Sequence, residues 1–320
     1  MTIIFYLISI FFFAFLLVKA TDILIVNFRS LSLKTKLGKF ALTSLVLGLA
    51  TSLPELFVGL SSAFNNQPIL SLGNVIGANI ANLSLVLGGA ALVVGLINIK
   101  EGFIRRDIFY AFLAASAPMV LLFDKFLSRI DGLILLVFYI FYQVVIFSER
   151  RSGLIKGEVN IVKRFLRKVS QKETRKEIVW IFIGIILLLI SANILVILAS
   201  RLAIAFNLPL FLIGLLIVAA GTTLPELVFS IKTLKEGQKE MFFGNLLGSI
   251  VTNGTLVIGL VALISPFRIQ AFSDYLLATM VFLITFGILF FFIKTKRKLE
   301  RWEGAVLLLV YLLFIFLETF

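Results

Sequence analysis

The chain has 320 residues, of which 60% are hydrophobic, and its mean hydropathy is +1.11. It carries 30 lysines and arginines against 17 aspartates and glutamates, a net charge of +13. Soluble domains are about 45–50% apolar, and apolar runs of about 18 residues or more cross a bilayer, so the composition indicates a polytopic membrane protein. The basic residues lie in short loops between apolar runs, which excludes a nucleic-acid partner. The absence of cysteine and histidine excludes disulfides, thiol chemistry, histidine metal sites, Ser-His-Asp triads and histidine proton relays.

Ten apolar segments follow one another along the chain. They cover residues 2–28, 38–62, 69–97, 107–124, 130–147, 178–200, 208–231, 241–265, 275–293 and 302–318. The first is expected to be a retained helix, because no basic region precedes it as in a signal peptide. It ends near residue 28, or nearer Lys19 if Lys19 and Asp22 interrupt it. The polar stretch 148–177 is interpreted as a basic cytoplasmic linker between a half comprising residues 1–147 and a half comprising 178–320.

The loop charges predict the orientation of the chain. With the N-terminus outside, the cytoplasmic loops hold 25 of the 30 lysines and arginines, and the opposite loops hold four. Such a bias is typical of the positive-inside rule. We therefore expect an integral plasma or inner membrane protein with both termini outside. Trp180 and Trp302 fall near predicted cytoplasmic helix ends, where tryptophan commonly anchors a helix at the interface.

Two pairs of phrases recur at an offset of 171 residues. The first pair is Ala50-Thr51-Ser52-Leu53-Pro54-Glu55 and Gly221-Thr222-Thr223-Leu224-Pro225-Glu226, and the second is the run 73–82 and the run 244–253, each beginning Gly-Asn. Shorter matches relate 85–88 to 256–259 and 129–132 to 301–304. Because each half has an odd number of segments, the two repeats must be inverted relative to each other, which is typical of alternating-access transporters.

The glutamate phrases predict an ion site made of oxygen atoms. A carboxylate at membrane depth is costly and usually functional. Pro54 and Pro225 cannot donate hydrogen bonds to the carbonyls of Ala50 and Gly221, so each phrase is expected to break its helix. Each break then offers a carboxylate, hydroxyls and free carbonyls, a ligand set suited to Ca²⁺ and Na⁺. When both glutamates ionise, the site has a charge of −2, which one Ca²⁺, two or more monovalent cations, or protons can neutralise.

The Gly-Asn phrases are expected to face the glutamates. Their Gly-xxx-Gly pairs allow helices to approach closely. Asn82 and Asn253 are expected to converge on Glu55 and Glu226. The other asparagines, Asn74, Asn79 and Asn245, are expected to link helices by hydrogen bonds.

These phrases resemble the two α-repeats of the sodium/calcium exchanger branch of the calcium/cation antiporter superfamily, in its prokaryotic form. The resemblance covers both halves, with the α-repeats at about 38–97 and 208–265. It implies an all-α membrane fold of ten transmembrane helices in two inverted five-helix repeats, without the large cytoplasmic regulatory domain of some members. By position it implies Ca²⁺ ligands at Glu55, Glu226, Thr51 and Thr222, Na⁺ ligands at Ser52, Thr223, Ser249 and the carbonyls near Gly48 and Ala219, and Asn82 and Asn253 at the centre.

Two positions depart from the pattern of the family. Many sodium-coupled members have an aspartate where this chain has Asn253, and a serine often stands at the place of Ala78. Both departures remove oxygen atoms that could bind Na⁺, although an asparagine keeps its carbonyl oxygen. The superfamily also has proton-coupled members, and two protons can discharge a site with two glutamates.

The expected function is therefore secondary antiport of Ca²⁺ against Na⁺, with H⁺ as the alternative coupling ion. Ca²⁺ and Na⁺ or H⁺ are transported ions, and neither a cofactor nor a protein partner is implied. A cation channel with the same lining is an alternative, but paired inverted repeats favour a carrier. An intramembrane enzyme is disfavoured, because acid and base roles usually need unlike environments, whereas the two glutamates have matching ones.

Overall fold

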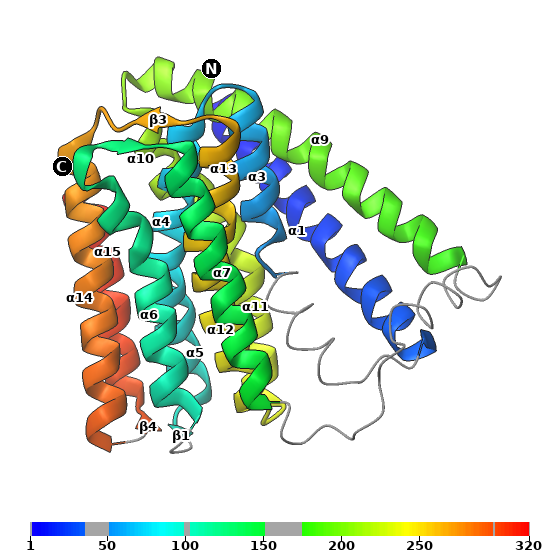
Figure 1. Cartoon of the computed structure of the whole chain (residues 1–320), viewed down its shortest axis with the longest axis vertical. Coiled ribbons are helices and arrows are strands. Elements are labelled where there is room, and N and C mark those ends of the chain that lie inside the picture. Colours follow the sequence, from blue (N-terminus) through cyan, green and yellow to red (C-terminus); the bar gives the residue numbers. More distant parts are fainter. Residues whose placement is uncertain (1, 36–50, 99–102, 151–174, 297, 320) are drawn as a thin grey trace.

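The computed structural model describes residues 2–35, 51–98, 103–150, 175–296 and 298–319 (Figure 1). In chain order the helices are α1 (Thr2–Thr35), α3 (Leu53–Phe64), α4 (Pro68–Ala81), η1 (Asn82–Val86), α5 (Leu87–Val94), α6 (Phe103–Leu121), η2 (Leu122–Asp124), α7 (Arg129–Arg150), α9 (Arg175–Phe206), α10 (Leu210–Leu212), η5 (Ile213–Val218), α11 (Ala219–Lys235), α12 (Lys239–Val251), η6 (Thr252–Val257), α13 (Ile258–Ile264), α14 (Phe272–Lys296) and α15 (Arg301–Thr319). Segments η1, η5 and η6 are π-helical, whereas η2 is a 3₁₀-helix. The strands are β1 (Ile97–Asn98), β2 (Phe126–Leu127), β3 (Phe267–Arg268) and β4 (Lys298–Leu299).

The predicted apolar segments correspond to helices. Among the described residues, seven helical spans are long and apolar enough to cross a membrane. The shorter apolar helices Leu53–Phe64 and Ile108–Asp124, together with α7, account for three further predicted segments. The count of ten stays a prediction, because residues 38–50 lie outside the described ranges.

Two of the predicted boundaries differ from the structure. Helix α1 continues past Lys19 and Asp22 to Thr35, so the shorter alternative for the first segment is wrong. Their opposite charges lie i, i+3 with 3.9 Å between Lys19 Nζ and Asp22 Oδ2, and the pair does not interrupt the helix. The predicted linker 148–177 is helical at both ends, since α7 extends to Arg150 and α9 begins at Arg175.

Burial separates a central group of helices from an outer one. In an apolar 18-residue stretch of the span Pro68–Val94, 83% of the residues are buried, and the corresponding share is 72% in Met241–Ile264 but only 22% in Arg301–Thr319. The exposed side chains of the outer helices are largely Phe, Leu, Ile and Val, as a lipid-facing surface requires. The two Gly-Asn phrases thus lie on the central helices.

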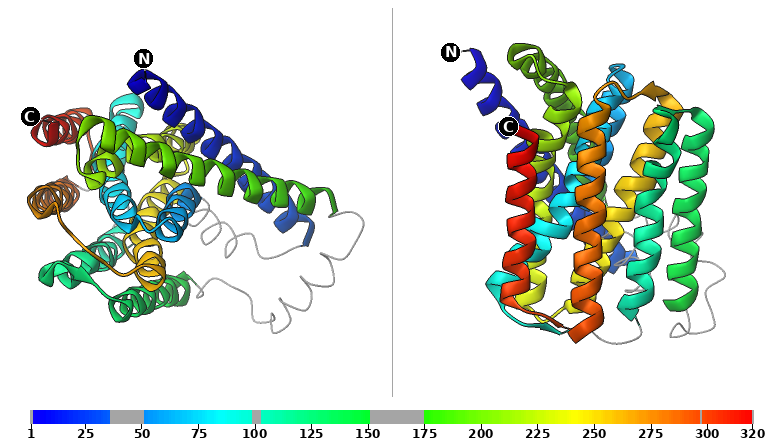
Figure 2. Two further views of the ribbon diagram at one scale, coloured as in Figure 1. Left: turned by 90° about the horizontal axis from the view of Figure 1, so that it is seen from above. Right: turned by 90° about the vertical axis from the view of Figure 1, so that its left-hand side faces the viewer.

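Helices α1 and α9 form a pair on one flank of the molecule (Figures 1 and 2). They pack along each other, and Gly184 of α9 allows close contact with Leu24 and the carbonyl of Ala20 on α1. The pair shares a hydrophobic cluster with α3 and with η5, separate from the larger cluster that joins the other helices. Each helix of this pair is the first helix of its half, so the flank is made equally by both repeats.

The two short strand pairs show the inversion of the repeats. Strand β1 follows α5 and pairs antiparallel with β4, which precedes α15; strand β3 follows α13 and pairs antiparallel with β2, which precedes α7. The two pairs are therefore equivalent between the halves, with the roles of the halves exchanged. They lie at opposite ends of the molecule (Figure 1), as a two-fold axis in the membrane plane requires.

Equivalent glycines mark two close helix crossings between the halves. A Cβ added to Gly88 on α5 would lie 2.7 Å from the carbonyl oxygen of Gly304 on α15, and a Cβ on Gly304 would lie 2.7 Å from the oxygen of Gly88. Gly259 on α13 and Gly132 on α7 make the same reciprocal contact, at 3.0 and 2.7 Å. The short matched phrases of the sequence thus mark two places where the repeats contact each other closely.

Candidate ion-binding site

Glu55 lies in the first turn of α3, directly after a turn at Ser52. Pro54 occupies the start of this helix, where its missing N–H costs no helical hydrogen bond. The exposed fraction of Glu55 is 0%. The sequence prediction of an interruption at this phrase agrees with the turn at Ser52. The positive end of the helix dipole favours a carboxylate in this first turn.

Glu226 lies inside α11, and here the predicted break is wrong. Helix α11 runs from Ala219 to Lys235 through Pro225 without interruption. The departure from α geometry comes earlier, in the π-helical segment η5 that ends at Val218. A proline removes only one donor, so a helix can pass through it when neighbouring turns adjust. The exposed fraction of Glu226 is 1%, so its carboxylate is as deeply buried as that of Glu55.

The two carboxylates lie among polar groups from both repeats. Thr222 is the polar side chain beside Glu55, and Ser249 and Asn82 are beside Glu226, while the two carboxylates are close enough to repel each other. No oxygen of either carboxylate accepts a hydrogen bond from the described residues. The other buried oxygens without a described partner include Ser52 Oγ, Thr223 Oγ1, Asn82 Oδ1 and Asn253 Oδ1.

Ser52 and Glu55 have the spacing of a helix capping box, but they do not form one. Neither Ser52 Oγ nor the Glu55 carboxylate has a described hydrogen-bond partner. At the start of α7, by contrast, Ser128 and Asp131 form reciprocal bonds, with 2.8 Å from Ser128 N to Asp131 Oδ2 and 3.2 Å from Asp131 N to Ser128 Oγ. A serine hydroxyl and a carboxylate three residues apart therefore bond to the local backbone at the start of α7, whereas the same pair of groups at the buried site makes no such bonds.

Basic side chains do not balance the two buried carboxylates. Among the described residues, no lysine or arginine is buried. Two buried charges of one sign cost several kcal/mol unless a counter-charge is present. A set of unpaired carboxylate, hydroxyl and amide oxygens is the donor set that hard cations such as Ca²⁺ and Na⁺ require. The residues present thus fit a cation.

Two equivalent hydrogen bonds join the repeats next to the glutamates. The hydroxyl of Thr51 donates to Asn245 Oδ1 on α12 at 2.8 Å, and that of Thr222 donates to Asn74 Oδ1 on α4 at 3.2 Å. Thr51 Oγ1 is also 3.0 Å from Ser249 Oγ. The position equivalent to Ser249 is Ala78, which has no hydroxyl, so the two halves of the site differ here. Asn74 and Asn245 act as the helix linkers that the sequence predicts.

A third bond between the repeats lies at the π-helical turns. Asn253 Nδ2, in η6, donates to Asn79 Oδ1 on α4 at 3.2 Å, and Asn79 Nδ2 donates to the carbonyl oxygen of Ile250 at 3.2 Å. Asn82 and Asn253 each stand at the beginning of a π-helical segment. Such segments are frequent at functional sites. No pattern in the sequence indicates them beyond the polar residues that they contain.

The predicted site residues fall into three groups in the structure. The first group is buried and polar: Glu55, Glu226, Thr51, Thr222, Ser52, Thr223, Asn82, Asn253 and Ser249. Of these, the structure brings the two glutamates together with Thr51, Thr222, Asn82 and Ser249. Ala219 contributes its carbonyl oxygen, which accepts a bond of 3.3 Å from the Thr222 hydroxyl. Gly48 lies outside the described residues. Their roles as ion ligands stay predictions.

Four other polar residues make local hydrogen bonds away from the glutamates. Asp124 and Asp131 accept backbone N–H groups near the start of β2 and α7, and Glu303 accepts the N–H of Glu300 at the start of α15. Asn193 accepts from the side chains of Ser61 on α3 and of Asn65, the residue directly after α3. These bonds cap helix ends and link α9 to the end of α3.

Comparison with known proteins places this arrangement in one family. The sodium/calcium exchanger protein family matches residues 5–148 and 176–320, which correspond to the two halves. The inner membrane protein YrbG of Escherichia coli is 30% identical over 82% of this chain and 81% of its own length. The sodium/calcium exchanger MaX1 of Methanosarcina acetivorans is 26% identical over 93% of this chain and 94% of its own length.

A solved structure of the sodium-calcium exchanger NCX_Mj has the same fold. It superposes with a TM-score of 0.64 at 26% identity and covers 98% of this chain and 99% of its own. The prokaryotic-type exchanger fold expected from the sequence is thereby confirmed, with several membrane-spanning helices. The chain belongs to the sodium/calcium exchanger family.

Proposed function

We propose that the protein is a secondary antiporter that moves Ca²⁺ against Na⁺ across its membrane. The observation that carries the proposal is the pair of fully buried carboxylates, Glu55 and Glu226, whose oxygens have no described hydrogen-bond partner. Membership of an exchanger family and the ions in the names of similar proteins support the choice of Ca²⁺ and Na⁺.

The charge of the site explains coupling between the two ions. With both glutamates ionised the site carries −2, and moving that charge through the low-dielectric interior is strongly unfavourable. One Ca²⁺ neutralises it, as do two Na⁺. The carrier therefore changes the side on which its site is open only when ions are bound, which links the movement of one ion to the countermovement of the other.

The site lies between two equivalent halves, which supports alternating access. Each glutamate helix contacts the Gly-Asn helix of the other repeat through one threonine–asparagine bond. A rearrangement of one half relative to the other would exchange the two sides of the membrane at the site. Glu55, Glu226, Asn82, Asn253 and the neighbouring hydroxyls are the proposed ligands.

Proteoliposomes loaded with Na⁺ and diluted into Na⁺-free buffer with ⁴⁵Ca²⁺ test this proposal. We expect Ca²⁺ uptake that depends on the outward Na⁺ gradient and stops when a Na⁺ ionophore dissipates it. A parallel experiment imposes only a pH gradient. Uptake under the pH gradient alone would identify H⁺ instead of Na⁺ as the coupling ion, an alternative that is consistent with the uncharged side chains of Asn253 and Ala78. Ca²⁺ flux independent of both gradients would contradict antiport and indicate a channel.

A further inference from the structure

Asn79 has a position in the site that its neighbours do not share. It lies on α4, its exposed fraction is 3%, and both atoms of its side-chain amide are used in bonds to the opposite repeat. The residue at the equivalent position of the second repeat, 171 residues later, is Ile250. Asn79 therefore donates to the backbone of its own counterpart, close to the pseudo-two-fold axis.

The bonds of Asn79 determine which way the Asn253 amide faces. A backbone carbonyl can only accept a hydrogen bond, so the Asn79 atom facing Ile250 O must be the nitrogen. The Asn79 oxygen then faces Asn253, and the Asn253 atom opposite it must be the nitrogen. The remaining oxygen of Asn253, fully buried and without a described partner, is turned away from Asn79.

Asn82, the counterpart of Asn253, is not held by the residue at the symmetry-related position. The residue placed to orient it by symmetry is Ile250, whose side chain has no hydrogen-bonding atom. Both Asn82 Nδ2 and Asn82 Oδ1 lack a described hydrogen-bond partner, although the side chain is fully buried beside Glu226. Its amide can present either its oxygen or its nitrogen to the centre.

We propose that Asn79 is a positioning residue that holds the oxygen of Asn253 toward the bound cation, and that Ile250 leaves the amide of Asn82 free to turn. The site then has one fixed and one adjustable neutral oxygen between its two carboxylates. The inference rests on the proposed function, because it assumes that a cation binds between Glu55 and Glu226.

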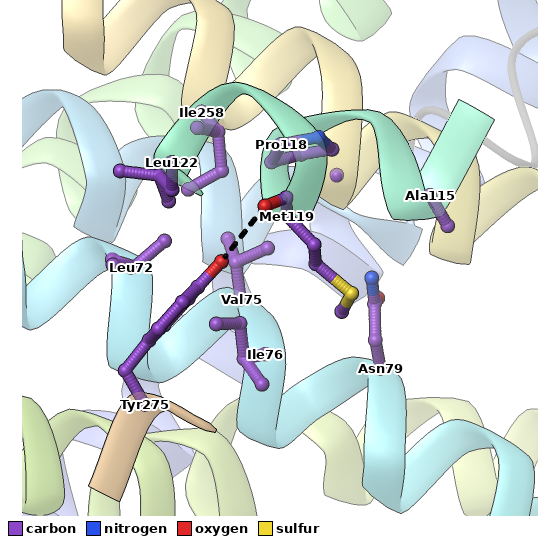
Figure 3. A pocket seen from close by; sticks show the side chains of 11 residues that line it. Leu72, Val75, Ile76, Asn79, Ala115, Pro118, Met119, Leu122, Ile258 and Tyr275 are labelled. Atoms are coloured by element: carbon purple, nitrogen blue, oxygen red, sulfur yellow. Dashed lines mark hydrogen bonds between the residues drawn. The ribbon is translucent and has the colours of Figure 1, made fainter. Parts of the chain in front are cut away.

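The surroundings of Asn79 allow it to be replaced. It lies at the edge of a cavity of about 10 Å³ that is otherwise lined mainly by apolar side chains of α4, α6 and α13 (Figure 3). The one other polar side chain of this lining, Tyr275, donates from its hydroxyl to the carbonyl oxygen of Met119 at 3.5 Å. Leucine and asparagine branch at the same carbon and have the same number of side-chain heavy atoms, so Asn79→Leu removes the two bonds with a small change in packing.

The experiment measures binding and transport in purified protein. Binding is taken from the rise in unfolding temperature as Ca²⁺ or Na⁺ is titrated, and transport from ⁴⁵Ca²⁺ uptake. Asn79→Leu is expected to raise the Ca²⁺ concentration for half-maximal effect about two- to tenfold, the range of one neutral hydrogen bond, with a smaller loss of maximal rate. Thr285→Val, which removes a buried hydroxyl bonded within α14, is the control and should leave that concentration unchanged.

A second background separates orientation from general damage. In Asn253→Asp both oxygens of residue 253 can bind a cation, so its orientation no longer matters and Asn79→Leu should change the half-maximal concentration less than twofold. Asn79→Ala gives the same comparison if leucine impairs folding. An equal loss of affinity in both backgrounds, or no loss in either, would overturn the role of Asn79. Cation binding without gradient-driven uptake would instead reject the antiport function and leave the binding comparison to decide the role of Asn79.

Discussion

At the scale of single residues, the charges of Glu55 and Glu226 dominate the site. Each is buried, and no basic side chain of the described chain is buried with them. Glu55→Gln or Glu226→Gln keeps the shape of the side chain and removes one charge. We expect ion-gradient-driven Ca²⁺ uptake to fall at least about a hundredfold. Removing one buried carboxylate charge removes several kcal/mol of the attraction for the cation, and each loss of about 1.4 kcal/mol of binding energy lowers the affinity tenfold.

The thermal stability of these two variants should not fall with their transport activity. Measured without bound cations, the unfolding temperature of either variant should stay level or rise, since a neutral amide is easier to bury than an unpaired carboxylate. Glu303→Gln is the matched control, because Glu303 is equally buried but bonded to the N–H of Glu300. It should retain transport. A fully active double variant at Glu55 and Glu226 would refute the site.

The unequal hydroxyls of the two halves give a second prediction. Thr51 has both Asn245 and Ser249 as partners, whereas Thr222 has Asn74 and the carbonyl of Ala219. Ala78→Ser restores the missing hydroxyl at the position equivalent to Ser249. It should lower the Na⁺ concentration for half-maximal exchange about two- to tenfold, as expected for one added neutral ligand, and leave the Ca²⁺ dependence nearly unchanged.

Uptake measured over a series of Na⁺ gradients at fixed Ca²⁺ checks this prediction. Ala90→Ser is the control, because Ala90 is as buried as Ala78 but lies on α5 away from the threonine contacts. An equal effect of the two serines would show that added polarity, rather than a ligand at position 78, is responsible. No effect of Ala78→Ser would remove this position from the Na⁺ site.

At the scale of helices, the reciprocal glycine contacts between α5 and α15 and between α7 and α13 leave little room for a side chain. Gly304→Ala places a Cβ 2.7 Å from the oxygen of Gly88, a rigid backbone atom. We expect a loss of about 1–3 kcal/mol of stability, the usual cost of overpacking a close contact. Gly287→Ala on α14 is the control, since a Cβ there meets nothing within 4 Å, and alanine's higher helix propensity predicts a gain of up to about 1 kcal/mol.

Thermal unfolding of the purified protein in detergent measures both variants. The difference between them isolates the contact, because the change of residue type and the gain in propensity are the same in each. If Gly304→Ala is as stable as Gly287→Ala, then the helices α5 and α15 separate easily, and the matched glycines of the two halves have no role in holding the repeats together.

The elements also show what sequence can and cannot predict. The sequence was enough to predict helices in inverted halves. The length of each apolar run is a local property that indicates a spanning helix, and the repeated Leu-Pro-Glu phrases with an odd number of segments in each half indicate the inversion. The π-helical turns at Asn82 and Asn253 were not predictable, since widening a turn by one residue depends on packing against other helices. For the same reason the continuity of α11 through Pro225 was missed.

Asn79 was predicted as a linker, but only its bonds to Ile250 and Asn253 show how asymmetric the link is.

At the scale of the whole molecule, the inverted halves leave the absolute orientation in the membrane to be decided by charge. The fold has equivalent elements at both ends, such as the β1–β4 and β2–β3 pairs. The uneven distribution of lysine and arginine breaks this symmetry and predicts that the β2–β3 end faces outside. That end also has a cavity of about 430 Å³, lined by Gln67, Arg268 and Gln270 among others, which on this orientation opens toward the exterior.

The natural sequence contains no cysteine, so one introduced thiol reports the orientation without background. Gln270→Cys, in the exposed loop after β3, and Glu236→Cys, in the exposed turn before α12, lie on either side of the spanning helix Met241–Ile264. A membrane-impermeant maleimide applied to intact cells should label residue 270 and not residue 236, and both after permeabilisation. Labelling of residue 236 alone would place the N-terminus inside, and would mean that the basic residues of this chain do not follow the positive-inside rule.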